Sequence, residues 1–161
     1  MSDRTRTFSW QDPELYKKGR EMSGLDFLRA IMRQELPTPP FASTLGIVGI
    51  SAEEGHVVFE MPVAEFHFSP LMMMHGGITA TLLDTVMGCA VQSTLKSGGG
   101  YTTTDLHIRY VRPIGLESGT LRAEGRVVHR GSRTATAEGT VVDARGKPVA
   151  FGTTGCLILE P

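Results

Sequence analysis

The sequence predicts an α+β fold in which one long buried helix packs against an antiparallel sheet. Residues 75–94 are apolar around the whole circumference of a helix, which is typical of a helix surrounded by protein. The segments before and after this stretch alternate apolar and polar residues, as half-buried strands do. Short links separate the last of these segments, and such links are typical of antiparallel hairpins.

The composition is that of a globular protein, with 161 residues of which 40% are hydrophobic and 20% are charged. Its formal net charge is −1, and no basic stripe follows the chain, which excludes a nucleic-acid partner. It has no signal-like start and no apolar run of about 18 residues, so we expect no membrane span. Two distant cysteines, Cys89 and Cys156, indicate free thiols and a cytoplasmic location.

Residues 1–40 are expected to form an N-terminal tail and a helical cap, and residues 41–161 the body of the protein. Within the cap, Ser23 and Asp26 make the capping-box pattern that starts an amphipathic helix. The prolines after Leu36 end that helix. We expect its apolar face to pack on the body, and a helix that recruits a partner protein is the alternative.

Strand-like runs lie on both sides of the long helix. Residues 44–52 and 56–63 precede it, and the Glu-Glu-Gly turn between them predicts a hairpin. A loop rich in Phe and Met leads from this hairpin into the helix. After the helix and a Gly-rich break, four more runs predict strands at residues 101–112, 121–129, 134–143 and 148–159.

The long helix contains one carboxylate, Asp84, and the chain has no other Asp or Glu between Phe66 and Thr104. Burying even a polar group without a partner costs about 2–7 kcal/mol, and burying a charge costs more. A residue that departs so strongly from its surroundings indicates a functional site. A structural hydrogen bond is the alternative interpretation of this carboxylate.

The start of the same helix is a second candidate. His75 is followed by Gly76 and Gly77 where the helical pattern begins. The first N–H groups of a helix are unpaired and carry a partial positive charge, and a residue without a Cβ lets another molecule approach them. The pattern therefore predicts a site for an oxyanion, about two turns from Asp84 on one helix.

These residues resemble the hot-dog fold acyl-CoA thioesterases of the phenylacetic-acid-degradation type. The resemblance covers roughly residues 41–160. It implies a curved antiparallel sheet wrapped around the long central helix, with two subunits paired edge to edge and the active sites between them. Such dimers often pair again into a homotetramer. The matching pieces are His67, Ser69-Pro70, His75-Gly76-Gly77, Asp84, Thr102 to Asp105, Tyr110, Arg112-Pro113, Val128 to Arg133 and Val149 to Leu159.

The resemblance also implies a reaction: acyl-CoA thioesters, aryl or medium-chain, are hydrolysed to a free acid and CoA without a metal or cofactor. In that reaction the Gly76 backbone N–H polarises the carbonyl, and Asp84 acts as general base or nucleophile. His75 shapes the helix start, and Thr103 helps to hold the attacking water. Ser69 stands where many relatives have an Asn or Gln that orients water or substrate.

Further residues are expected to bind the substrate, and among them Arg130 and Arg133, together with Lys147, would meet the phosphates of CoA. A solvated hairpin is the alternative for that basic segment. Two other functions stay open, namely a non-catalytic acyl-CoA binding module and a hot-dog hydratase or dehydratase that uses His75 and Asp84. The expected substrate-binding residues are Gly77, Thr102, Thr104, Arg130, Gly131 and Arg133.

Overall fold

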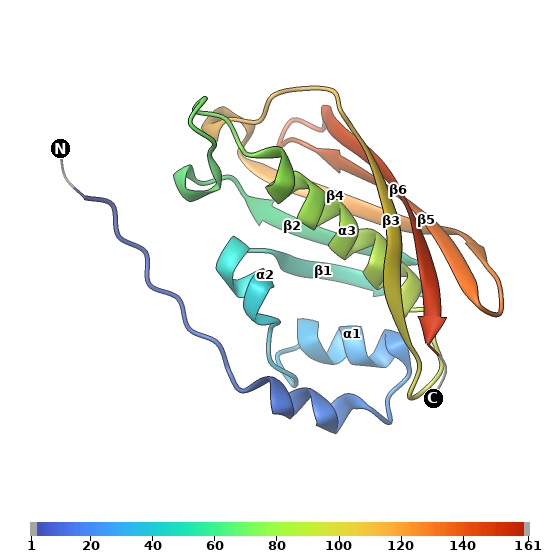
Figure 1. Ribbon diagram of the computed structural model, residues 1–161. Coiled ribbons are helices and arrows are strands. Elements are labelled where there is room, and N and C mark those ends of the chain that lie inside the picture. The colour runs from blue at the N-terminus through green and yellow to red at the C-terminus, as the bar shows by residue number, and fades with distance from the viewer. Residues whose placement is uncertain (1–2, 160–161) are drawn as a thin grey trace.

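The computed structural model describes residues 3–159 and shows a six-stranded antiparallel sheet curved around one long helix (Figure 1). The strands lie in the order β1-β2-β4-β5-β6-β3, so β1 and β3 form the two edges. The predicted α+β class with a central helix is confirmed. The strands are β1 (Val48–Glu53), β2 (His56–Pro62), β3 (Gly100–Tyr110), β4 (Thr120–Arg130), β5 (Thr134–Val142) and β6 (Pro148–Leu159).

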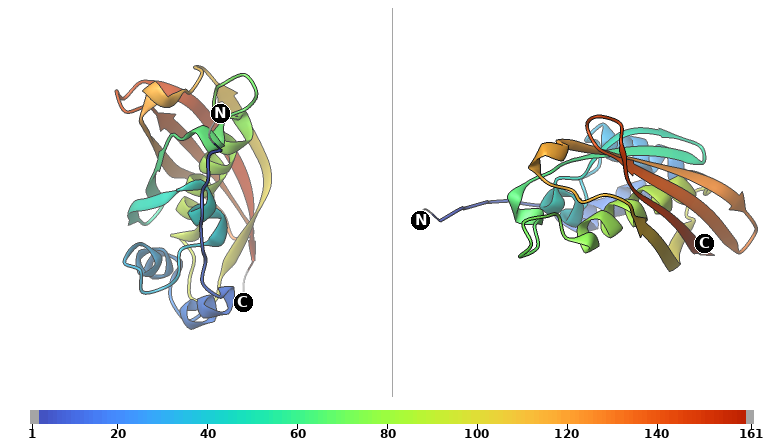
Figure 2. Two further views of the ribbon diagram at one scale, coloured as in Figure 1. Left: turned by 90° about the vertical axis from the view of Figure 1, so that its left-hand side faces the viewer. Right: turned by 90° about the horizontal axis from the view of Figure 1, so that it is seen from above.

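The central helix, α3 (Gly76–Gln92), lies within the curve of the sheet (Figure 2). A row of glycines on β4, β5 and β6, namely Gly125, Gly139 and Gly152, faces it in register. A Cβ on Gly125 would lie 2.5 Å from the carbonyl oxygen of Val86, so only glycine allows the helix to come this close to the sheet. No helix within residues 3–159 is long and apolar enough to cross a membrane.

The N-terminal cap consists of a 3-10 helix, η1 (Pro13–Gly19), and two short α-helices, α1 (Gly24–Met32) and α2 (Pro40–Leu45). Ser23 caps α1 as its sequence pattern predicts, since its hydroxyl accepts the Asp26 N–H at 3.1 Å and donates to Asp26 Oδ2 at 2.7 Å.

One prediction in this region is wrong, because residues 44–47 are not the start of a strand. Pro39 and Pro40 instead begin α2, since the fixed φ of proline suits the first turn of a helix. Gly46, with φ of +76°, ends α2 in the left-handed conformation, and β1 begins at Val48. The residues that look strand-like in sequence therefore close a short helix.

His67 ends a short 3-10 helix, η2 (Glu65–His67), and is only 2% exposed. Its Nδ1 accepts the Ala64 N–H at 3.2 Å, and its Nε2 lies 2.9 Å from the carbonyl oxygen of Leu45. These contacts assign the tautomer in which Nε2 donates, and they satisfy both ring nitrogens. His67 therefore joins η2 to the end of α2 as a neutral structural residue.

We expect this histidine to make the fold sensitive to mild acid. Burial lowers the pKa of His67 below the ordinary value of about 6.5, although its bond to Leu45 opposes this shift. The unfolded chain therefore binds a proton first, and the free energy of unfolding should fall as pH drops from about 6.5 through the folded pKa. Urea unfolding at several pH values should show a flatter profile for His67→Gln than for the wild type. The exposed control His129→Gln should keep the wild-type profile, and a His67→Gln profile as steep as wild type would contradict the assignment.

Candidate active site

Asp84 lies in the wall of a cavity of about 500 Å³ between α3, β1 and the helices α1 and α2. Most of the side chains that line the cavity are apolar, and among the described residues Asp84 alone adds a charge to it. The side of α3 that bears Asp84 is thus half-buried against a cavity, whereas Leu82, Leu83 and Val86 are fully buried in the core. The isolated carboxylate in the apolar helix is explained by this cavity.

Thr103 contacts this carboxylate directly, because its hydroxyl donates a hydrogen bond of 2.8 Å to Asp84 Oδ1. A β-bulge between Thr103 and Asp105 interrupts the pairing of β3 with β6. The extra residue lets both Thr104 and Asp105 lie exposed, while Thr103 keeps its place toward the helix. No residue from 3 to 159 donates to Asp84 Oδ2, so this oxygen is free to bind a water.

Tyr101 also lines the cavity, although nothing in the sequence singled it out. A Cβ on Gly88 would lie 2.2 Å from the Tyr101 hydroxyl oxygen, so this glycine, one turn after Asp84, makes room for the ring. An isolated glycine in the middle of a helix was the available signal. Burial raises the pKa of Tyr101, and it raises the pKa of the neighbouring Cys89 to about 12, so both are neutral at pH 7.

At the start of α3 the first N–H groups have different partners. Gly77 donates to His75 Nδ1 at 3.0 Å, and Ile78 donates to the His75 carbonyl oxygen at 2.9 Å. The Gly76 N–H finds no acceptor within residues 3–159. The Tyr110 hydroxyl donates to the Gly76 carbonyl oxygen at 2.9 Å and holds this peptide in place. Of the two glycines, Gly76 is therefore the one whose N–H remains available to a ligand.

Gly76 and Asp84 lie well apart within a single chain. They lie eight residues apart on α3, which corresponds to about 12 Å along the helix axis. A hydrogen-bond donor and a base-held water must each lie about 3 Å from the reacting group. One helix carries both groups, as the sequence indicates, and their separation is large for two groups that act on one carbonyl.

The structure does not bring the remaining predicted residues to Asp84. Thr102 and Thr104 lie exposed, on the side of β3 away from Thr103. The Ser69 hydroxyl accepts the Leu71 N–H at 3.3 Å in the loop before α3, so it belongs to the Gly76 end of the helix. The other three predicted residues lie in the hairpin between β4 and β5, where the exposed Arg130 guanidinium donates to the Gly131 carbonyl oxygen. These hairpin residues are Arg130, Gly131 and Arg133.

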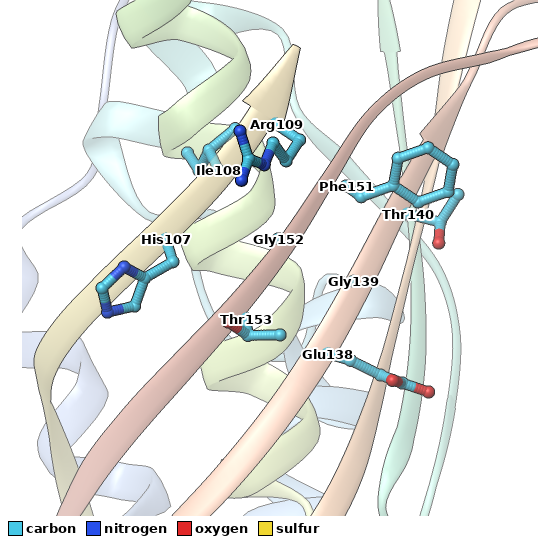
Figure 3. A pocket seen from close by; sticks show the side chains of 9 residues that line it. All are labelled: His107, Ile108, Arg109, Glu138, Gly139, Thr140, Phe151, Gly152 and Thr153. Carbon is cyan, nitrogen blue, oxygen red and sulfur yellow. The ribbon is translucent and has the colours of Figure 1, made fainter. Parts of the chain in front are cut away.

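A second hollow lies on the outer face of the sheet, over β3, β5 and β6 (Figure 3). His107, Arg109, Glu138 and Phe151 project from these strands around it. This face is turned away from α3, and none of the predicted site residues lines the hollow. The cavity beside Asp84 is therefore the candidate active site.

Comparison with known proteins agrees with this choice. The Thioesterase superfamily profile matches residues 72–150, which include Gly76, Asp84 and Thr103. Human acyl-coenzyme A thioesterase 13 is 34% identical over 90 residues, which are 55% of this chain and 64% of that protein. The match thus spans less than two thirds of the length of that relative.

Two further relatives match more of their own length. The proofreading thioesterase EntH of Klebsiella pneumoniae is 32% identical over 103 residues, which are 64% of this chain and 74% of EntH. The PaaI protein from the phenylacetic acid degradation operon of E. coli superposes with a TM-score of 0.74 and 27% identity, over 86% of this chain and 96% of PaaI. From its fold and these matches, the chain belongs to the thioesterase superfamily, as a hot-dog protein of the phenylacetic-acid type.

Proposed function

We propose that the protein hydrolyses acyl-coenzyme A thioesters to a free acid and coenzyme A. The observation that carries this proposal is Asp84 in the wall of an apolar cavity, with one oxygen bonded to Thr103 and the other free. An acyl group fits the apolar wall, and a carboxylate there can accept a proton from water. The acyl-coenzyme A thioesterase name of the human relative supports the same substrate class.

In this mechanism a water held by the free oxygen of Asp84 attacks the thioester carbonyl carbon. Asp84 takes the proton of the water while the Gly76 N–H stabilises the negative charge that develops on the carbonyl oxygen. The C–S bond then breaks, and the coenzyme A thiolate leaves and takes up the proton from Asp84. A variant of the mechanism, in which Asp84 itself attacks the carbonyl, uses the same groups.

We propose that each active site combines Asp84 of one subunit with the Gly76 N–H of a second copy. The separation of about 12 Å along one helix, at about 1.5 Å per residue, supports a site built from two chains. The free edge of β3, the strand that carries Thr103, supports pairing of two copies along this edge. We further propose that two such dimers pair into a dimer of dimers. We also propose a cytoplasmic location, which the free thiols Cys89 and Cys156 support.

A panel assay tests the proposed reaction. The protein is incubated with aryl- and fatty-acyl-CoAs and a thiol-reactive dye, and thiol release is expected. Tight binding with no release from any thioester would instead favour the binding module, and loss of the absorbance of an enoyl-CoA would favour the hydratase. His75 Nδ1 already accepts the Gly77 N–H at the helix start, which leaves only Nε2 for the acid–base step of a hydratase.

Thr103→Val should lower kcat about tenfold without raising KM to the same degree. The hydroxyl orients the carboxylate, and a hydrogen bond to a charged group contributes about 1.5–3 kcal/mol. Thr103→Ser keeps a hydroxyl on the same side of β3 and should retain most of the activity. Steady-state kinetics of both variants check this prediction, and an unchanged kcat for Thr103→Val would remove Thr103 from the site.

A further inference from the structure

The N-terminal helices form part of the cavity that contains Asp84. Ile31 and Met32 of α1 and Phe41 of α2 line it, together with the α3 residues around the acid. The cap is therefore not only a cover for the hydrophobic core. It closes the space into which the proposed reaction must place part of its substrate.

This wall is attached firmly to the body of the protein. The Gly24 N–H at the start of α1 donates to the Leu95 carbonyl oxygen at 2.9 Å, and a Cβ at Gly24 would lie only 1.8 Å from the Gln92 carbonyl oxygen. Further along α1, Arg29 Nε donates to the Ala52 carbonyl oxygen of β1 at 3.1 Å. Because α1 is fixed at both places, its side of the cavity is in place before a ligand enters.

The chemistry of the wall restricts what can bind. No Lys, Arg or His is among the described residues that line the cavity, so an acyl group with its own carboxylate would be desolvated next to Asp84 without a counter-charge. A volume of about 500 Å³ lies within the range of small-molecule sites, about 300–1,000 Å³, and exceeds the needs of an acetyl group. An uncharged apolar acyl group of medium length matches both properties.

We infer that the acyl group is held inside a single subunit, between α3 and the N-terminal helices, and that α1 and α2 determine which acyl groups the protein accepts. This inference rests on the proposed hydrolysis and names its substrate class. The Thioesterase superfamily profile begins at residue 72, so both helices lie outside the part of the chain that it matches. The reacting groups and the residues that select the acyl group thus occupy different parts of the chain.

The test compares kcat/KM for butanoyl-, octanoyl-, phenylacetyl- and glutaryl-CoA. Ile31→Phe narrows the cavity, and it should lower the octanoyl-to-butanoyl ratio of kcat/KM about tenfold or more, as a change of one or two methylenes in an apolar pocket does. Phe41→Ala widens the cavity and should raise that ratio, and because Phe41 is 45% exposed, its truncation should preserve the fold. Leu25→Ala alters a cap residue outside the cavity and should keep the wild-type ratio.

The possible outcomes separate this inference from the proposed function. For the wild type, kcat/KM for glutaryl-CoA should be about 100-fold or more below that for octanoyl-CoA. A wild type that releases thiol, with the same octanoyl-to-butanoyl ratio in Ile31→Phe, Phe41→Ala and Leu25→Ala, would overturn the inference and leave the hydrolysis standing. A wild type that releases no thiol from any substrate would instead overturn the proposed function. The melting temperature of each variant identifies any that has lost its fold.

Discussion

Asp84→Asn is expected to lower kcat by about 10²–10⁴-fold, the contribution of a positioned base. Asn has the size and shape of Asp, and its amide oxygen can still accept the Thr103 hydroxyl that bonds Oδ1 at 2.8 Å. The substitution therefore removes the base without opening a cavity, and the melting temperature should change little. KM for the acyl-CoA should also change little, because the apolar wall that holds the acyl group remains.

A matched control for this variant is Asp105→Asn. Asp105 also lies near Thr103 on β3, but it is exposed on the other side of the strand and accepts the Gly155 N–H at 3.1 Å. This variant should keep the wild-type kcat. If Asp84→Asn hydrolysed acyl-CoA at the wild-type rate, Asp84 would be a structural residue and the proposed mechanism would be wrong. Label found in Asp84 after a single turnover in H₂¹⁸O would establish the nucleophilic variant, in which water opens the acyl–Asp84 anhydride at the Asp84 carbon, because the general-base mechanism places the label in the free acid alone.

Gly76→Pro is expected to lower kcat by about 10²–10³-fold relative to Gly76→Ala, which is the effect of losing one oxyanion donor. Gly76 is the first residue of α3, where proline is tolerated. His75, with φ of −64° and ψ of 134°, already has the extended conformation that precedes proline. Proline therefore deletes the free N–H and keeps the helix start.

Gly76→Ala is the matched control because it keeps this N–H. Both substitutions add a Cβ that would lie 3.3 Å from the Tyr110 ring, so the comparison cancels this contact. Steady-state kinetics and the melting temperature of the two variants provide the measurement. Equal kcat values for Gly76→Pro and Gly76→Ala would exclude the Gly76 N–H as the donor.

Mixing the two inactive variants tests whether the site is shared between subunits. If each site takes Asp84 from one copy and Gly76 from another, a heterodimer of Asp84→Asn and Gly76→Pro has one intact site. Random reassembly should then restore about a quarter of the wild-type activity, since half of the dimers are mixed and each of these has one working site of two. No recovery in verified heterodimers would place both groups in one chain and contradict the proposed assembly.

Some of these features were predictable because they depend on local patterns. The period of apolar residues identified α3 and most of the strands, and the departures from that period identified Asp84 and Gly76. Residues 44–47 were predicted wrongly because a short run of apolar and polar residues suits a strand and a short helix equally well. The division of the chain into a cap and a body at residue 40 stays a prediction.

The sequence by itself determined the class of fold and the two chemical groups, because periodicity, charge and glycine placement are properties of neighbouring residues. Only the tertiary structure decided that the Thr103 hydroxyl donates a hydrogen bond to Asp84, that Tyr101 and the cap line the cavity, and that Gly76 keeps a free N–H. These facts depend on the bulge in β3 and on contacts between segments far apart in the chain. The positions of such segments follow from packing of the whole domain, which no local pattern contains.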